Sequence, residues 1–196
     1  PDMVALTGDL VDGSGEHLSD GIAPLGDLEA REGVYFVTGN HEYYSGARSW
    51  CQKMADLGAN VLLNAHHLIE RGSGRLLIAG VTDHRAGRML PQHASDPDAA
   101  MSGAPEHDVR ILLAHQPNSC RKAKPHGFDL QLSGHTHGGQ MFPWNLLVHF
   151  AHDFSRGLNR FGRGWVYVNT GTGYWGPPMR VGVQSEITLL RLVRAV

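Results

Sequence analysis

The stretch FDLQLSGHTH, residues 128–137, best shows how this chain folds. Its first five residues form a largely apolar run that predicts a β-strand, and Gly134 then allows a tight turn. His135 and His137 follow two positions apart. Because residues two apart in an extended stretch point to the same side, both rings can face one pocket. The stretch therefore predicts a strand that delivers two imidazoles at its end.

Three other apolar runs, each predicted to be a strand, are followed by polar side chains in the same way. They are residues 3–7 before Gly8-Asp9, residues 34–37 before Gly39-Asn40-His41, and residues 109–114 before His115. In α/β sheets the carboxyl ends of the strands are where ligands bind. One carboxylate, one carboxamide and several imidazoles suit divalent transition metals such as Mn, Fe or Zn. We therefore expect a metal-dependent hydrolase.

Each of these residues also has a structural interpretation. Asp9 alone is more often a turn residue, and Asn40-His41 alone is more often a loop or a helix cap. His115 can simply end a strand, and a His-x-His pair occurs often by chance. The recurrence of such groups after four apolar runs favours a common metal site over four separate coincidences.

The remaining pattern predicts a single mixed-sheet α/β domain over residues 1–196, with two packed sheets flanked by helices. Helices are expected at 47–57, 96–101 and 119–124. Gly58 ends the first of them, and the second lies within a long loop over 82–105. Further strands are expected at 61–63, 68–70, 76–79, 165–168 and 186–190. The three strands between 61 and 79 are close in sequence, which favours partly antiparallel pairing.

Composition narrows the function classes. The 196 residues are 41% hydrophobic and 18% charged, with a net charge of -2. This balance provides no basic field, so nucleic-acid binding is not expected. The two cysteines, Cys51 and Cys120, form neither a close-spaced metal motif nor a disulfide framework. The chain starts at Pro1 rather than at Met, which predicts a fragment or a processed product whose targeting signal lies outside it.

The motifs resemble those of the calcineurin-like metallophosphoesterases. The matching residues are Gly8 to Gly13 (GDLVDG), Gly39 to Glu42 (GNHE), His115, and Gly134 to His137 (GHTH). The longer strings NHEYYSG at 40–46, LSGHTHGGQ at 132–140 and GYWGPPMR at 173–180 are similar to a bacterial branch of membrane-associated phosphodiesterases of the YaeI type.

This resemblance implies a fold, an activity and roles for named residues. The fold would be an αββα sandwich, and the activity would be phosphoester hydrolysis by a hydroxide that bridges two divalent metal ions. Asp9 would bridge both metals, Asn40, His115 and His135 would complete the second metal site, and His137 would bind the first metal. His41 would lie over the scissile phosphate, with Asp12 orienting its ring.

The chain departs from the family pattern at its start. The family has an Asp-x-His motif on a strand before the position of Asp9, and this motif is absent here. We therefore expect a chain that is truncated at its N-terminus, holds the first metal weakly and lacks one strand. Loss of that strand would leave an unpaired sheet edge.

The substrate is less evident from the sequence. Arg180 can contact a phosphate, although a surface ion pair is an equal alternative, and residues 83–85 can border the pocket. The apolar residues 141–150 suit either the core or a lipid-facing wall. The resemblance implies a small-molecule or lipid-linked phosphoester substrate. It also implies a bacterial protein that is located at the cytoplasmic face of a membrane, or associated with the membrane through a segment outside this chain. The alternatives are a non-catalytic metal-binding or scaffold module and, less favoured by the charge, a nuclease of the same fold.

Overall fold

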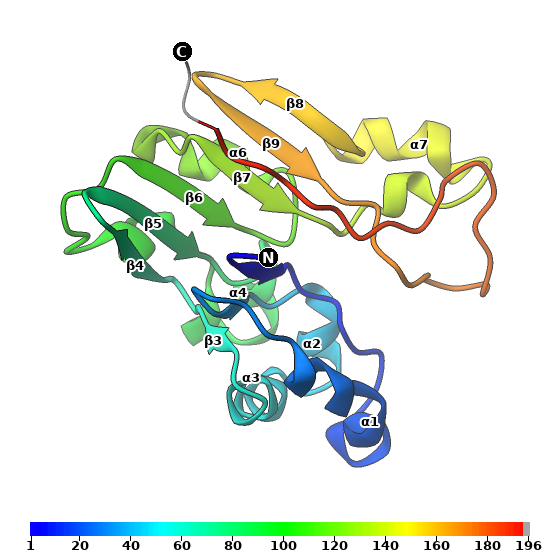
Figure 1. Ribbon diagram of the computed structural model, residues 1–196. Helices are drawn as coiled ribbons and strands as arrows, with labels where there is room; N and C mark the ends of the chain where they lie inside the picture. The colour runs from blue at the N-terminus through cyan, green and yellow to red at the C-terminus, as the bar shows by residue number, and fades with distance from the viewer. Residues whose placement is uncertain (194–196) are drawn as a thin grey trace.

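The apolar runs form strands of two β-sheets (Figure 1). The computed structural model describes residues 1–193, apart from the side chains of residues 15–17. The smaller sheet is parallel and has the order β1 (Val4–Leu6), β2 (Val34–Phe36), β3 (Asn60–Val61). The larger sheet has the order β4 (Ala65–Arg71), β5 (Gly74–Gly80), β6 (Val109–Leu113), β7 (Leu130–Ser133), β9 (Gly164–Val168), β8 (Gly157–Phe161).

The larger sheet is mixed. Its four central strands β5, β6, β7 and β9 run parallel to one another, and the outer strands β4 and β8 are antiparallel to their neighbours. The central strands consequently end on the same side of the sheet, which brings the loops after β6 and β7 together.

Short helices connect the strands. They are α1 (Gly15–Ile22), η1 (Ala23–Asp27), α2 (Asn40–Tyr44), α3 (Ala47–Asp56), α4 (Ala86–Met89), η2 (Pro91–His93), α5 (Pro97–Met101), α6 (Ser119–Ala123), η3 (Lys124–His126), η4 (His137–Gly139) and α7 (Trp144–Ala151), where η denotes a 3-10 helix.

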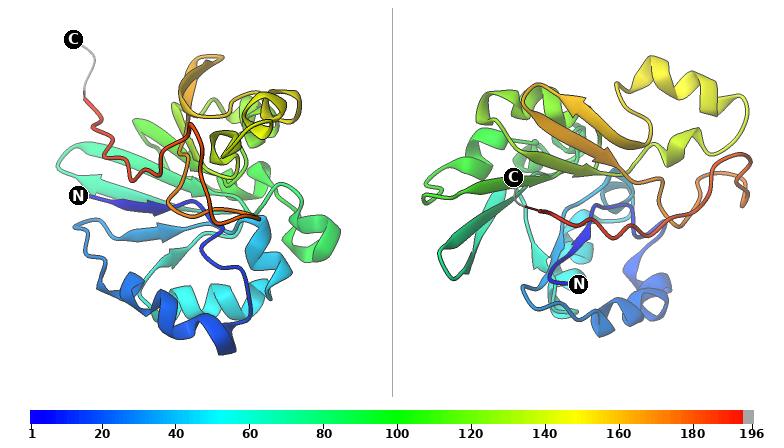
Figure 2. Two further views of the ribbon diagram at one scale, coloured as in Figure 1. Left: turned by 90° about the vertical axis from the view of Figure 1, so that its right-hand side faces the viewer. Right: turned by 45° about the horizontal axis from the view of Figure 1, so that its top comes forward.

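Three apolar clusters define the layers. The central cluster joins Tyr35 and Val37 of the smaller sheet to Ile78, Ile111 and Leu113 of the larger one, so the two sheets pack face to face. A second cluster packs α5 and α6 on the outer face of the larger sheet. A third packs α1 and α3 on the outer face of the smaller sheet, as Figure 2 shows. The predicted α/β class with two packed sheets flanked by helices is therefore confirmed.

Helix α3 shows how the sequence builds one of these layers. Ala47, Trp50 and Met54 are buried and recur at helical spacing, so one face of the helix packs inward. Gly58 follows with a φ of 89°, a left-handed conformation that suits glycine and ends the helix where the sequence predicted.

The strand predicted at 186–190 is wrong. This segment is extended but joins neither sheet, and its apolar side chains Ile187 and Leu189 are 91% and 83% exposed. The segment lies against β9 through side-chain contacts of Tyr167, and β9 already has β7 on one edge and β8 on the other. An apolar alternation adds a strand to a neighbour only where that neighbour offers a free edge.

The partly antiparallel pairing predicted between residues 61 and 79 is confirmed, because β4 and β5 are antiparallel. The run at 61–63 contributes β3, which pairs in parallel with β2 in the smaller sheet. Strand β8 was not predicted, since GLNRF has little apolar alternation, and it forms by hairpin pairing with β9. The core interpretation of residues 141–150 is wrong, because helix α7 has no buried residue. The predicted helix at 96–101 is confirmed as α5, with the Asp96 side chain as its N-cap.

Candidate metal centre

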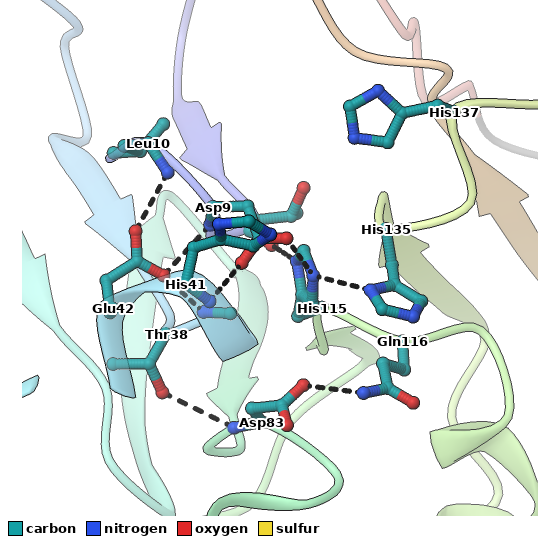
Figure 3. A network of polar contacts seen from close by, with 12 residues as sticks. Asp9, Leu10, Thr38, His41, Glu42, Asp83, His115, Gln116, His135 and His137 are labelled. Carbon is teal, nitrogen blue, oxygen red and sulfur yellow. Dashed lines mark hydrogen bonds and ion pairs between the residues drawn. The ribbon is translucent and has the colours of Figure 1, made fainter. Parts of the chain in front are cut away.

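The predicted ligands lie where the two sheets meet, in the loops that follow parallel strands. Asp9 comes after β1, Asn40 after β2, His115 after β6 and His135 after β7. Figure 3 shows these loops converging, with the Asp9, His115 and His135 side chains directed toward one another. One oxygen of Asp9 and one nitrogen of each of these histidines lie within 4.8 Å of one another. That spacing suits ligands that share one metal ion.

The contacts within this group are short. Asp9 Oδ2 lies 2.9 Å from His115 Nε2, and His115 Nε2 lies 3.0 Å from His135 Nδ1. Each of these atoms can coordinate a metal once it carries no proton. A carboxylate with two imidazoles is a donor set suited to Mn, Fe or Zn.

His115 is held in the orientation that a metal ligand needs. Its Nδ1 lies 2.7 Å from the Thr7 carbonyl oxygen, which can only accept, so Nδ1 carries a hydrogen. In the neutral ring this leaves the lone pair on Nε2, the nitrogen that faces Asp9. The backbone after β1 thus selects the tautomer of His115, which follows β6.

Asn40 provides a separate test of whether a metal fits. The residue is only 8% exposed, and its Oδ1 has no hydrogen-bond partner within the described chain. A buried amide oxygen without a partner is costly in a folded protein. Coordination to a metal would satisfy this oxygen, so the residues present fit the group that the motifs imply.

Two glycines make the close packing of this centre possible. A Cβ on Gly39 would lie 2.1 Å from Asp9 Oδ1, and a Cβ on Gly8 would lie 2.3 Å from the Gly39 nitrogen. Neither contact is sterically allowed, so no larger residue fits at these positions without displacing Asp9. Asp9, His135 and His137 themselves have φ values of 55°, 70° and 50°, a region that non-glycine residues rarely adopt.

The titration properties of the centre follow from burial and from the facing charges. Burial alone would raise the pKa of Asp9, but the His115 ring lowers it to about 2. Burial alone would lower the pKa of His115, but the Asp9 carboxylate raises it to about 9. Burial, together with the neighbouring His115 ring, lowers the pKa of His135 to about 2. The metal-free centre is therefore an ion pair of Asp9 and His115 beside a neutral His135.

These shifts predict how the stability of the metal-free protein depends on pH. The raised pKa of His115 stabilises the fold fully below its ordinary pKa of 6.5, and this stabilisation is lost as the pH rises through about 9. The depressed pKa of His135 acts in the opposite direction, because stability is lost as the pH falls below 6.5 and the unfolded chain takes up a proton. Asp9 adds a further loss as the pH falls from 3.8 toward about 2.

The melting temperature of the chelator-treated protein is therefore expected to peak near pH 6.5 and to fall on both sides. Thermal unfolding followed by circular dichroism over pH 4 to 9 measures it, and the variant His115→Asn should lose the decline on the alkaline side. An equal melting temperature at pH 6.5 and pH 9 would contradict the assignment of the ion pair.

Glu42 is a structural member of the centre that the sequence did not single out. Its side chain is 1% exposed and accepts hydrogen bonds from the backbone N–H groups of Asp9, Leu10 and Gly39 at 2.9, 2.8 and 2.6 Å. Burial, followed by the nearby Asp9 carboxylate, raises the pKa of Glu42. Glu42 therefore ties the β1 loop to the β2 loop. Its place in the NHE string of the motif was the signal available.

Replacing Glu42 by alanine is expected to lower the free energy of unfolding by roughly 3 kcal/mol or more, because three buried donors lose their acceptor. Urea denaturation measures this change. The matched control is Glu29→Ala, at an exposed position, which should change stability by less than about 0.5 kcal/mol. Equal denaturation midpoints for the two variants would refute the role of Glu42.

His41 and Asp12 lie together at the open side of the centre. His41 Nδ1 is 3.0 Å from Asp12 Oδ1, and the backbone N–H of His41 donates to Asp9 Oδ1 at 2.9 Å. The Asp12 side chain is 87% exposed, so its pairing with His41 contributes orientation more than stability. The His41 ring is in edge contact with Tyr44, at 5.5 Å between centroids.

His137 and Arg180 form a second group beside the first. Figure 3 shows His137 set apart from Asp9, His115 and His135. Arg180 Nη2 lies 3.0 Å from His137 Nδ1 and also donates to the Thr170 carbonyl at 2.8 Å. Burial, followed by the Arg180 charge, lowers the pKa of His137 to about 4. Arg180 is thus bound to His137 and to backbone carbonyls, in place of the surface ion pair considered as an alternative.

Two more residues lie near the centre, and the sequence pattern does not single out either as a ligand. Asp83, at the start of the long loop, is fully buried, and its Oδ2 accepts from Gln116 Nε2 at 2.9 Å next to His115. His152 follows α7, and its ring lies 5.0 Å from that of His135. The position of Asp83 just after β5 repeats the pattern of a polar residue after a strand, whereas nothing local distinguishes His152.

A sandwich of two sheets with carboxylate and imidazole groups at the strand ends defines a metallohydrolase-type centre. The chain belongs to the calcineurin-like metallophosphoesterases, since the family described as calcineurin-like phosphoesterase matches residues 1–139.

Relatives of known sequence agree with this family. The chain is 40% identical over 204 residues to a zebrafish (Danio rerio) protein named transmembrane protein with metallophosphoesterase domain, covering 100% of this chain and 46% of the relative. It is 42% identical over 195 residues to an uncharacterized metallophosphoesterase of Helicobacter pylori strain 26695, covering 98% of this chain and 51% of the relative. The chain therefore spans about half the length of the curated relatives it matches.

Solved structures share the fold. The sulfate thiohydrolase SoxB of Thermus thermophilus, solved with glycerol, superposes with a TM-score of 0.58 at 18% identity, over 85% of this chain and 33% of that one. A 5'-nucleotidase precursor from Thermus thermophilus superposes with a TM-score of 0.56 at 16% identity, over 85% and 39% of the two chains. None of the helices described between Pro1 and Val193 is both long and apolar enough to cross a bilayer.

Proposed function

We propose that this chain is the catalytic domain of a metal-dependent phosphoesterase that hydrolyses a phosphodiester, phosphomonoester or pyrophosphate bond. The observation that carries the proposal is the convergence of Asp9, His115 and His135 from three different strand ends, with His41 directly beside them. We further propose that residues 1–196 act as one domain.

Asp9, Asn40, His115 and His135 would hold one divalent ion, and Asp9 with His137 would contribute to a second. Bound Mn, Fe or Zn supplies Lewis acidity and lowers the pKa of water, so that a nucleophile is available near neutral pH. The unpaired Oδ1 of Asn40 and the Nε2 lone pair of His115 support this ligand set.

His41 would serve as the group that protonates the leaving oxygen. Its Nδ1 is held by Asp12, so the ring presents Nε2 away from that carboxylate. A carboxylate at Nδ1 fixes the orientation of the ring, so that Nε2 is the nitrogen available for proton transfer. Arg180 would donate a hydrogen bond to a phosphate oxygen through Nη1. This nitrogen is buried and has no partner among the described residues, whereas Nε donates to the Gly173 carbonyl and Nη2 to the Thr170 carbonyl.

A lipid-linked substrate is the finer proposal. Helix α7 follows the metal-binding loop directly, and its exposed apolar side chains are Trp144, Leu146, Leu147 and Phe150, with Phe142 just before it. The Trp144 ring packs edge-on against Trp175 of the C-terminal loop, at 5.8 Å between centroids. Such a surface beside the centre suits an acyl chain or a membrane surface. The name of the zebrafish relative, a transmembrane protein, supports a membrane location for the whole protein.

The test is hydrolysis of bis(p-nitrophenyl) phosphate by the metal-depleted protein, with Mn, Fe or Zn added back and bound metal counted by elemental analysis. Turnover that rises with bound metal supports the proposal, and metal binding without turnover on any phosphoester would favour the non-catalytic module. The proposal of a lipid-linked substrate is tested by comparing the turnover of acylated and non-acylated diesters at equal concentration. Equal turnover of the two would refute it.

The non-catalytic module is retained as a second candidate for one reason. His137 is engaged by Arg180 rather than placed with the other three ligands. A chain that binds only one ion would match that arrangement.

A further inference from the structure

A cavity of about 290 Å³ lies at the opposite end of the central strands from the metal centre. It is enclosed by α6 and η3, by the amino ends of β7 and β9, and by the turn between β8 and β9. Its walls are apolar and include Phe128, Phe161, Trp165 and Val166. The metal centre lies beyond the carboxyl end of β7, so the two sites occupy different ends of the same strand.

One polar side chain in the cavity wall has an unused hydrogen-bond acceptor. Gln131 on β7 is 2% exposed, and its Nε2 donates to the Pro117 carbonyl at 3.0 Å and to Ser133 Oγ at 2.9 Å. These two acceptors fix which end of the amide is nitrogen. Gln131 Oε1 has no partner within the described residues, although it is buried. A ligand that supplies one N–H or O–H donor would satisfy it.

Two cations stand at the mouth of the same cavity. Lys124 of η3 and Arg163 of the β8–β9 turn both line it, and both are exposed. Neither side chain makes an ion pair with any acidic residue in the described part of the chain, whereas Arg121 nearby is paired with Asp153. A ligand with an acidic group at its outer end would complement these charges.

We propose that this cavity binds a small aromatic carboxylate that carries a hydrogen-bond donor at its other end. The ring would pack among Phe128, Phe161 and Val166, the donor would reach Gln131 Oε1, and the carboxylate would lie between Lys124 and Arg163. The volume is near the lower end of the range for small-molecule pockets, roughly 300–1,000 Å³, which selects a single-ring ligand. The site is independent of the proposed hydrolysis, because none of its lining residues belongs to the metal centre.

The experiment uses 3-(4-hydroxyphenyl)propionate as the probe and isothermal titration calorimetry as the readout. Two matched compounds separate the contacts: the corresponding propionamide lacks the charge, and 3-phenylpropionate lacks the donor. We expect saturable binding of the parent compound and a weakening of about three- to tenfold for each matched compound.

Variants test the location. Lys124→Ala and Arg163→Ala are surface changes that should fold normally, and each should weaken carboxylate binding by about threefold or more while leaving propionamide binding unchanged. Lys53→Ala on α3 removes an equivalent charge far from the cavity and should change nothing. Ala123→Leu should fill the cavity and block all three compounds, provided that circular dichroism shows a folded protein.

Absence of saturable binding up to the solubility limit of the probe would overturn the proposal. Equal binding of the parent compound by the wild-type protein and by the double variant of Lys124 and Arg163 would overturn it as well. Both outcomes can be read on protein that is inactive as a phosphoesterase, so failure of this site is distinguishable from failure of the proposed function.

Discussion

Replacing Asp9 by asparagine is expected to reduce phosphoester turnover by at least about a thousandfold, equivalent to ~4 kcal/mol of transition-state stabilisation. The change keeps the size of the side chain and leaves an oxygen that can accept from the His41 N–H, so the loops need not move. It removes the negative charge that faces His115 and that would neutralise the metal ions. Metal affinity should fall together with turnover, because a neutral amide is a weaker ligand for a divalent cation than a carboxylate.

Three measurements are needed on this variant: bound metal per chain by elemental analysis, turnover of a generic phosphodiester, and the melting temperature after chelation. Asp27→Asn, at an exposed position outside the centre, is the matched control and should behave as wild type. Wild-type metal content and near-normal turnover in the Asp9→Asn protein would refute the prediction that Asp9 binds metal.

The second large effect is expected at His41. The variant His41→Gln should bind metal as well as the wild type, since the structure pairs the His41 ring with Asp12 and Tyr44 and not with the three clustered ligands. Its turnover of a substrate with a poor leaving group should fall by about a hundred- to ten-thousandfold, the usual contribution of general acid catalysis.

The leaving group provides an internal control for this prediction. A p-nitrophenolate leaves without help from an acid, so the same variant should lose much less activity on p-nitrophenyl esters than on alkyl esters. His67→Ala, an exposed histidine on β4, should leave both activities unchanged. An equal loss on both substrates would mean that His41 does not act as the acid.

The variant Asp12→Asn should also lose more activity on alkyl esters than on p-nitrophenyl esters. Its loss should be smaller than that of His41→Gln, because the Asp12 carboxylate is exposed.

Local sequence information was sufficient for the four strands that precede the candidate site. The runs before Asp9, Asn40, His115 and His135 are short, apolar and followed by turn residues, and each forms a strand. Strands β6 and β7 are parallel and end on the same side of the larger sheet, which brings His115 and His135 together. Asp9 reaches them from β1 of the smaller sheet, because the two sheets pack face to face. The residue roles inferred from the motifs remain predictions that the variants above can test.

Other features depend on partners that a sequence window does not contain. Residues 186–190 have strand composition but contact the Tyr167 side chain of β9, whose two edges are paired with β7 and β8. Glu42 looks like an ordinary helical acid in the sequence, and only the fold brings three backbone donors from the β1 and β2 loops to it. The contact of Arg180 with His137 joins residues 43 positions apart, a distance over which neither spacing nor periodicity is informative.

The left-handed residues of the centre carry a consequence for how such a protein changes over evolutionary time. Asp9, His135, His137 and Gln140 all have positive φ values between 50° and 70°, and each such residue costs about 1–2 kcal/mol relative to glycine. Glycine at any of these positions would remove this backbone cost, and at Asp9 it would also remove the ion pair with His115. Glycine at Asp9, His135 or His137 would also remove a proposed ligand. Relief of backbone strain and retention of the proposed activity therefore favour different residues at these three positions.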